Sequence, residues 1–502
     1  MIKKFTYAIT AASLAIGVLQ AEEKKLNVLM IAVDDMRPEL GCYGASHVKS
    51  PNIDKLAASG LLFKRAYCQQ AICGPTRASL LTGLRPDSSG VHGNHAHYRD
   101  KNPDIVTLPQ HFKNNGYFSA ACGKINHGVF PKGMAPRWDV MGDAESWSTP
   151  AFRPGPRYYY TEEGIKAAQG IFKRIYPKKP IEKWTEHLVF GPLTEASPVE
   201  DDVLYDGQVA KRAVEYLDEF GKKKDQPFFL AVGFIKPHSP YIAPEKYFNL
   251  YDPEKIALAE NPDFPTDAPR YAGHSSGEKR RYTDQAKRGA FSTKDQQRTK
   301  QAYYACISYI DAQIGLVLDA LDENGLAENT IVILWSDHGY HLGEKGLWGK
   351  TTNYELDTNV AFICRAPGMK AEAVGKQSKA LVELVDVFPS LADLAGIPVT
   401  KKLEGSSIKP LLADPDMKWK HAAFSQFGRG KRRGYAMKTD RYRYVEWLDT
   451  KNGNAVVDRE LYDHQNDPKE TKNIAKDPAQ AKVVEELSEY LNQGKGWKKA
   501  QL

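Results

Sequence analysis

The sequence predicts an α/β protein: a large, mostly parallel sheet sandwiched between helices, followed by a smaller C-terminal antiparallel sheet domain with a helix. Short apolar runs alternate with helical segments along most of the chain, which is typical of parallel strands joined by crossover helices. After about residue 416 this pattern gives way to short alternating segments separated by turns, which favour antiparallel strands. We therefore expect a main domain over residues 22–415 and a smaller one over 416–502.

The predicted strands of the main sheet are short apolar runs. The first is rich in β-branched residues, as expected of a strand that is buried on both faces of a sheet. The clearest helix spans residues 301–321 and has one apolar stripe along its length, which indicates a face that packs on a core. The five strand runs cover residues 26–33, 117–122, 227–234, 330–335 and 360–364.

The smaller domain and two intervening segments complete the predicted organisation. Segments 143–197 and 257–294 read as inserted loop regions, and long loops of this kind often form a substrate-facing surface. In the C-terminal part, the expected strands lie at 435–438, 442–447 and 460–463, and the expected terminal helix lies at 479–492.

The N-terminus has the pattern of a secretory signal peptide over residues 1–21. Lys3 and Lys4 precede an apolar stretch from 5 to 19, and Ala21 is a small residue at a plausible cleavage point. We expect the mature protein to be exported, periplasmic or secreted, without a stable membrane anchor. The net charge of +7 over 502 residues is modest and no nucleic-acid-binding motif accompanies it, so a nucleic-acid partner is not expected.

The stretch from Cys73 to Gly83 is the strongest candidate for a reactive site. Pro75 suits the first turn of a helix, and Gly83 can end it. Cys73 is then expected at the helix N-terminus, where free N–H groups and the helix dipole favour an anion. Arg77 adds a permanent cation one turn later. The pattern indicates a nucleophile that handles an anionic group.

This Cys-x-Pro-x-Arg element, followed by Leu-Thr-Gly, resembles the signature of the type I sulfatases, which have an alkaline-phosphatase-like fold. The likeness is sharpest toward iduronate-2-sulfatase-like members, because residues 27–38, 41–44, 123–127 and 231–238 match that subgroup. The resemblance implies that a maturase oxidises Cys73 to formylglycine, whose hydrate attacks the sulfur of a sulfate ester.

Two pairs of polar residues follow predicted strands and suggest a metal site. Asp34 and Asp35 come after the first strand, and Asp337 and His338 after the fourth. This set is dominated by oxygen ligands, which suits a hard cation such as Ca²⁺ or Mg²⁺. The resemblance implies the same positions, usually with Ca²⁺ in bacterial members, and a metal that also binds the formylglycine made from Cys73.

Four further residues match elements of the family in the expected order: Lys124, His127, His238 and Lys350. The resemblance implies that Arg77, Lys124 and Lys350 neutralise charge on the sulfate. His238, with or without Lys350, would protonate the departing oxygen. His127 would take a proton from the sulfated hydrate, which expels sulfate and restores the aldehyde.

The expected substrate is a sulfated saccharide. We expect the sulfate to be removed at a chain end, from a 2-O-sulfated uronic acid or a related acidic glycan. His95, His97 and Arg99 follow the nucleophile helix closely, and an arginine there could hold a carboxylate bidentately. The alternative is a surface loop that makes only local contacts. This segment and the two inserted loops match no family element.

Three other readings of the function remain open. One is a sulfatase that acts on another polysaccharide, such as a galactan or fucan. Another is a phosphonate or phosphodiester hydrolase of the same superfamily, since some members share the Cys-x-Pro-x-Arg element. The last is a non-catalytic carbohydrate-binding protein with the same fold. The presence of every expected catalytic residue favours an enzyme over this last class.

Overall fold

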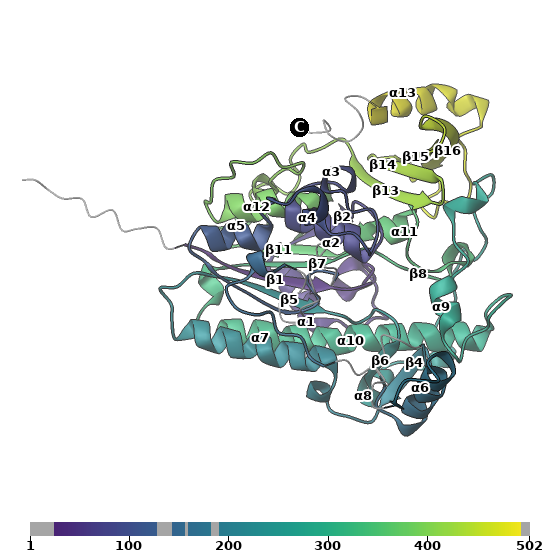
Figure 1. Cartoon of the computed structure of the whole chain (residues 1–502). Coiled ribbons are helices and arrows are strands. Elements are labelled where there is room, and N and C mark those ends of the chain that lie inside the picture. The colour runs from purple at the N-terminus through teal and green to yellow at the C-terminus, as the bar shows by residue number, and fades with distance from the viewer. Residues whose placement is uncertain (1–24, 128–142, 156–158, 182–189, 493–502) are drawn as a thin grey trace, which may run out of the picture.

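A computed structural model of the chain describes residues 25–127, 143–155, 159–181 and 190–492 (Figure 1). The predicted signal peptide lies outside the described residues. A central sheet has the strand order β10-β2-β11-β7-β1-β5-β3, and β12 pairs with β2. These strands are β1 (Asn27–Val33), β2 (Leu61–Tyr67), β3 (Phe118–Gly123), β5 (Phe228–Phe234), β7 (Thr330–Ser336), β10 (Asn359–Val360), β11 (Phe362–Arg365) and β12 (Lys376–Glu383).

The direction of the strands differs from the prediction at one side of this sheet. β7, β1, β5 and β3 are parallel neighbours, as expected. β11 runs antiparallel to both β7 and β2, which makes the sheet mixed. The chain leaves β7 at the carboxyl edge and re-enters the sheet beside it, without the crossover helix that a parallel return needs.

Helices cover both faces of the sheet (Figure 1). Alternate residues of β1 point to opposite sides. Leu29, Ile31 and Val33 join one core cluster, while Val28, Met30 and Ala32 join another. The first cluster involves α1 (Pro51–Ser59), α7 (Tyr205–Gly221) and α10 (Thr293–Glu323), and the second involves α2 (Cys73–Thr82), α5 (Leu108–Asn114) and α12 (Val387–Leu394).

Helix α10 extends beyond the predicted 301–321 at both ends and is the longest element of the first cluster. By length and composition it could cross a membrane, but 83% of its most apolar stretch is buried inside the protein. It packs against α7, α1 and β6 (Tyr241–Pro244). These contacts are those of a core helix.

The C-terminal sheet is antiparallel throughout, as predicted, with the order β13-β14-β15-β16. Its helix α13 packs on one face, at the upper right of Figure 1. The sequence did not reveal its first strand. The elements are β13 (Ala423–Arg429), β14 (Arg432–Lys438), β15 (Tyr442–Asp449), β16 (Ala455–Asp463) and α13 (Ala481–Asn492).

Both segments predicted as inserted loops contain regular structure. The first holds α6 (Glu162–Ile175) and β4 (Thr194–Ser197), which pairs with β6. The second contains α9 (Gly277–Arg281). The remaining helices and strands are short: α3 (Pro86–Ser89), α4 (Tyr98–Lys101), α8 (Glu245–Phe248), α11 (Glu355–Thr358), β8 (His341–Leu342) and β9 (Trp348–Gly349).

Candidate active site

Polar residues from several strand ends meet at the carboxyl edge of the parallel strands, which is where open α/β sheets bind their ligands. Asp34 and Asp35 directly follow β1, and Asp337 and His338 follow β7. Helix α2 brings its first residue, Cys73, to the same edge. The contacts described below also bring in Arg77, Lys124, His127, His238 and Lys350.

Cys73 is buried at the N-terminus of α2, as predicted. Its Sγ lies 3.4 Å from Nε2 of His338. Burial, together with the negative charge of Asp34, raises the pKa of the Cys73 thiol well above its usual value. The thiol is therefore protonated at neutral pH, and an unmodified Cys73 is a poor nucleophile.

Arg77 is buried and forms hydrogen bonds to the segments that follow three strands of the sheet. Its Nε donates to Asp337 Oδ2 at 2.9 Å, and Nη2 donates to Asp34 Oδ1 at 3.1 Å. Its Nη1 donates to the carbonyl oxygens of Lys124 and Ile125, at 2.6 and 3.1 Å. One guanidinium thus joins the chain after β1, β3 and β7.

Two lysines complete the charge balance of the three aspartates. Lys124 Nζ lies 2.5 Å from Asp34 Oδ2, and Lys350 Nζ lies 2.7 Å from each oxygen of Asp35. Burial alone would raise the pKa of Asp34, but Lys124 and Arg77 lower it well below the usual value. Asp34 therefore remains ionised in a buried site, whereas burial and the charge of Asp34 raise the pKa of Asp337.

A glycine fixes the turn that presents Lys124. Gly123 has φ 77°, and an added Cβ would lie 1.9 Å from the carbonyl oxygen of Gly233. The Lys124 amide donates to the same oxygen at 2.7 Å. Only glycine fits this left-handed, close approach between β3 and β5.

The donor set fits a divalent cation. Ligand atoms of Asp34, Asp35, Cys73 and His338 lie within 4.8 Å of one another, and all four residues are buried. Asp35 has a left-handed φ of 59°. Hydrogen bonds from its N–H and to its carbonyl oxygen stabilise this conformation. Its N–H donates to Asp337 Oδ1 at 3.1 Å, and its carbonyl accepts from Tyr303 at 2.7 Å. Such held strain is typical of functional sites.

The two predicted catalytic histidines have different surroundings. Nδ1 of His127 is buried and has no hydrogen-bond partner within the described residues. Burial and the charge of Lys124 lower the pKa of His127 to about 2, so its ring is neutral. His238 lies with Nδ1 2.7 Å from the carbonyl oxygen of Ser239.

Comparison with known proteins identifies the family. Residues 26–397 match the family described as Sulfatase, and residues 343–496 match the one described as N-sulphoglucosamine sulphohydrolase, C-terminal. This chain belongs to the sulfatase family. It is 32% identical to iduronate 2-sulfatase of Mus musculus over 532 residues, which cover 92% of this chain and 93% of that protein.

Solved structures show that the sulfatase has the alkaline-phosphatase-like fold expected from its sequence. A phosphonate monoester hydrolase of Agrobacterium radiobacter superposes with a TM-score of 0.70 at 23% identity, over 93% of this chain and 95% of that one. A structure described as a 2-O GAG sulfatase gives a TM-score of 0.65 at 23% identity, over 93% and 92% of the two chains.

The structure argues against a substrate role for Arg99 in this sulfatase. Its Nε and Nη2 form a bidentate pair with Asp143, at 2.7 and 3.0 Å. Its other N–H groups donate to Gln110 and to the carbonyl oxygens of Pro103 and Ile105. All five N–H groups are thus used inside the protein, which favours a structural role for Arg99.

The other two predicted substrate residues lie on the same loop. His97 is buried, and its Nδ1 accepts from the Arg99 amide at 3.1 Å. This histidine caps α4. His95 is exposed, and its role in substrate binding stays a prediction.

Sequence reasoning missed two residues of the site. Asn94 Oδ1 accepts a hydrogen bond from the Gly74 amide at 2.9 Å. It thus pairs with an N–H of the first helical turn, next to Cys73. Glu278, on α9, lies 3.8 Å from His238 and 4.0 Å from Lys350. No motif marks either residue. Asn94 could have been suspected from its position just after the nucleophile helix.

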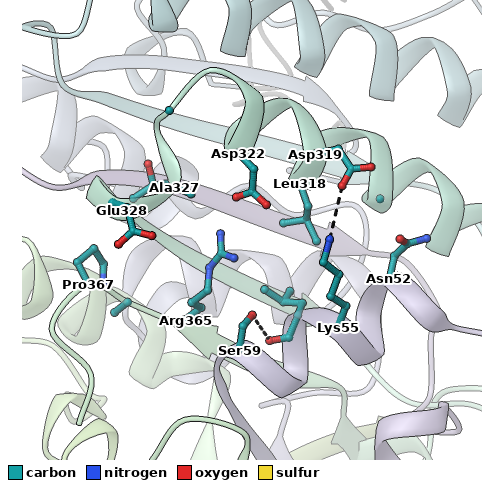
Figure 2. Close-up of a pocket in the computed structure, with 15 residues that line it drawn as sticks. Asn52, Lys55, Ser59, Leu318, Asp319, Asp322, Ala327, Glu328, Arg365 and Pro367 are labelled. Atoms are coloured by element: carbon teal, nitrogen blue, oxygen red, sulfur yellow. Dashed lines mark hydrogen bonds and ion pairs between the residues drawn. The ribbon is translucent and has the colours of Figure 1, made fainter. Parts of the chain in front are cut away.

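One cavity of the sulfatase is unrelated to this site. A space of about 630 Å³ lies at the amino end of β7, lined by residues of α1, α10 and the end of β11. Figure 2 shows Lys55 pointing toward Asp319 in this cavity, with Arg365 between Asp322 and Glu328. None of the predicted catalytic residues lines it.

Proposed function

We propose that this protein is an exported sulfatase that hydrolyses sulfate esters of carbohydrates, acting from a chain end on 2-O-sulfated uronic acid or a related acidic glycan. The observation that carries the sulfatase chemistry is the buried cluster in which Cys73 meets three aspartates and three cations. The likeness to an iduronate 2-sulfatase over nearly the whole of both chains supports the acidic glycan.

Asp34, Asp35, Asp337 and His338 would hold one Ca²⁺, together with the oxygen that formylglycine provides at position 73. These ligands are mainly carboxylate oxygens, which suit calcium. When bound, the cation supplies positive charge that polarises the sulfate and favours the ionised nucleophile. Formylglycine at position 73, made by a maturase, supplies the attacking hydroxyl group.

The remaining residues bind the sulfate and transfer protons. Arg77, Lys124 and Lys350 place three positive charges around Cys73, and we assign them to the charge that develops on the sulfate oxygens. His238 would donate a proton to the departing alcohol. His127 would take a proton from the sulfated hydrate, and its buried Nδ1 has no hydrogen-bond partner within the described residues.

A phosphonate or phosphodiester hydrolase is the second candidate. The similarity in fold to a phosphonate monoester hydrolase favours it. A tetrahedral anionic ester of either phosphorus or sulfur would meet the same ring of cations. A sulfatase directed to a neutral galactan or fucan is a narrower variant of the first proposal.

The test is a screen with protein produced together with a formylglycine-generating maturase and Ca²⁺. Sulfate release is measured on saccharides with a terminal 2-O-sulfated uronate, on internally sulfated chains, and on sulfated galactan and fucan. Release of the phenol or alcohol is measured on an aryl phosphonate and a phosphodiester. We expect the highest kcat/KM on the terminal uronate. Higher activity on galactan would overturn the substrate, and higher activity on the phosphorus esters would overturn the sulfatase chemistry.

A further inference from the structure

Glu278 reaches the active site from the inserted segment 257–294, on the short helix α9 beside β8 and β9 (Figure 1). Its neighbour Lys279 anchors this helix. Lys279 Nζ lies 4.1 Å from the ring centroid of Trp348 and 4.5 Å from that of Phe291, and it donates to Thr299. Helix α9 is therefore fixed, and Glu278 has a defined position.

The carboxylate of Glu278 lies near His238 and Lys350, two predicted catalytic residues, and accepts a hydrogen bond from Ser239. Oε1 accepts from Ser239 Oγ at 2.9 Å and lies 3.8 Å from Nε2 of His238, while Oε2 lies 4.0 Å from Lys350 Nζ. Burial would raise the pKa of Glu278, but Lys350 and His238 lower it to about 2. Its side chain is 31% exposed, so the ionised carboxylate is partly open to solvent.

The ring of His238 is held from two sides. Nδ1 lies 2.7 Å from the carbonyl oxygen of Ser239, and a carbonyl can only accept, so Nδ1 carries a hydrogen. The other nitrogen, Nε2, faces Glu278. Because Glu278 also accepts from the Ser239 hydroxyl, the same carboxylate fixes the residue that holds Nδ1.

We propose that Glu278 is a positioning residue for leaving-group protonation: directly and through Ser239, it holds His238 with Nε2 directed at the ester oxygen. This inference rests on the proposed function, in which His238 acts on the departing alcohol. As the bond between sulfur and the ester oxygen breaks, its electron pair goes to that oxygen. The oxygen takes a proton from Nε2 of His238, whose pKa burial lowers, and the ring is left neutral with its hydrogen on Nδ1.

A positioning role makes the effect of Glu278 depend on the leaving group. A sugar or alkyl alkoxide needs a proton as it departs, whereas 4-nitrophenolate leaves without one. Loss of Glu278 should therefore slow hydrolysis of alcohol esters and spare the aryl ester. A structural role would slow all esters alike.

The experiment compares wild type, Glu278→Gln and Glu278→Ala on three substrates: the preferred sulfated saccharide, an alkyl sulfate without hydroxyl groups, and 4-nitrophenyl sulfate. Glu254→Gln, on the exposed surface before this segment, is the control. We expect both Glu278 variants to lose about 10²-fold in kcat/KM on the two alcohol esters, the lower end of a general-acid contribution. On the aryl ester, both should stay close to wild type.

Two results would overturn the positioning role. Equal losses on all three substrates would assign Glu278 to folding of the site, and a loss on the saccharide alone would assign it to substrate binding. A failure of the proposed function looks different: wild-type protein would then hydrolyse a phosphodiester and release no sulfate from either alcohol ester. That result would overturn this inference with it.

Discussion

Lys350 donates to both carboxylate oxygens of Asp35, at 2.7 Å each, and only 6% of its side chain is exposed. The lysine thus neutralises a proposed metal ligand. We expect Lys350→Met to lower kcat/KM by about 10²- to 10³-fold, because one buried donor to the reacting group is lost. Bound Ca²⁺, measured by metal analysis, should stay near wild type, since Asp35 keeps its charge.

The matched control for this variant is Lys55→Met. Lys55 is 72% exposed and pairs with Asp319 at 3.8 Å, in the cavity at the other end of the sheet. Its replacement should leave both activity and metal content unchanged. Loss of metal from Lys350→Met would show that this lysine maintains the ligand set rather than acting on the sulfate.

Conversion of Cys73 is the second prediction. The raised pKa of the buried thiol makes an unmodified cysteine unsuitable for attack on a sulfate ester. Peptide mass spectrometry should show CH₂SH replaced by CHO at position 73 when the chain is made with a maturase. Cys73→Ala should show no turnover, and Cys73→Ser should stop as a sulfated serine. Full activity of Cys73→Ala would contradict the assignment.

The third prediction concerns the metal. Asp34, Asp35 and Asp337 place three carboxylates in a buried site, and a bound cation stabilises the folded state by mass action. Wild-type protein should contain about one Ca²⁺ per chain, and its melting temperature should rise as Ca²⁺ is added after chelation. Asp34→Asn should lose this response. Stoichiometric zinc that supports activity would contradict the calcium assignment.

The site was predictable where short motifs end buried strands. Asp34 and Asp337 could be placed at one edge because apolar runs mark β1 and β7 as strands of a mostly parallel sheet. Strand β2 was missed because Lys64 and Arg65 interrupt its apolar pattern, and the antiparallel direction of β11 has no local signal. Glu278 was missed because its partners lie 39 or more residues away in sequence. The pairing of Arg99 with Asp143 could not be predicted for the same reason, since the two residues are 44 positions apart.

The pair of Arg99 and Asp143 gives the fourth prediction. Arg99→Ala leaves a buried carboxylate, which is 2% exposed, without its cation. We expect a loss of about 3 kcal/mol in the free energy of unfolding, seen as a lower melting temperature. The ratio of kcat/KM on the acidic saccharide to that on an aryl sulfate should not change. A selective loss on the saccharide would restore Arg99 to the substrate site.

The final prediction concerns pH and the C-terminal sheet. Glu460 is buried and accepts hydrogen bonds from Trp447 at 2.7 Å and from Tyr462 at 2.6 Å. Burial outweighs these donors and raises the pKa of Glu460 to about 7. The folded state therefore keeps a proton that the unfolded chain releases near its ordinary glutamate pKa.

The direction in which stability changes with pH follows from proton linkage. The stabilisation from protonated Glu460 is complete below the ordinary glutamate pKa and is lost as pH rises to about 7, a change of about 3 kcal/mol. Glu460→Gln cannot ionise, so it removes this slope while other titrating groups stay the same. Melting temperatures are measured for both proteins from pH 5 to pH 8. The melting temperature of Glu460→Gln should rise relative to that of wild type as the pH increases. Parallel curves would mean that Glu460 titrates alike in the folded and unfolded chains, which contradicts its buried, proton-retaining state.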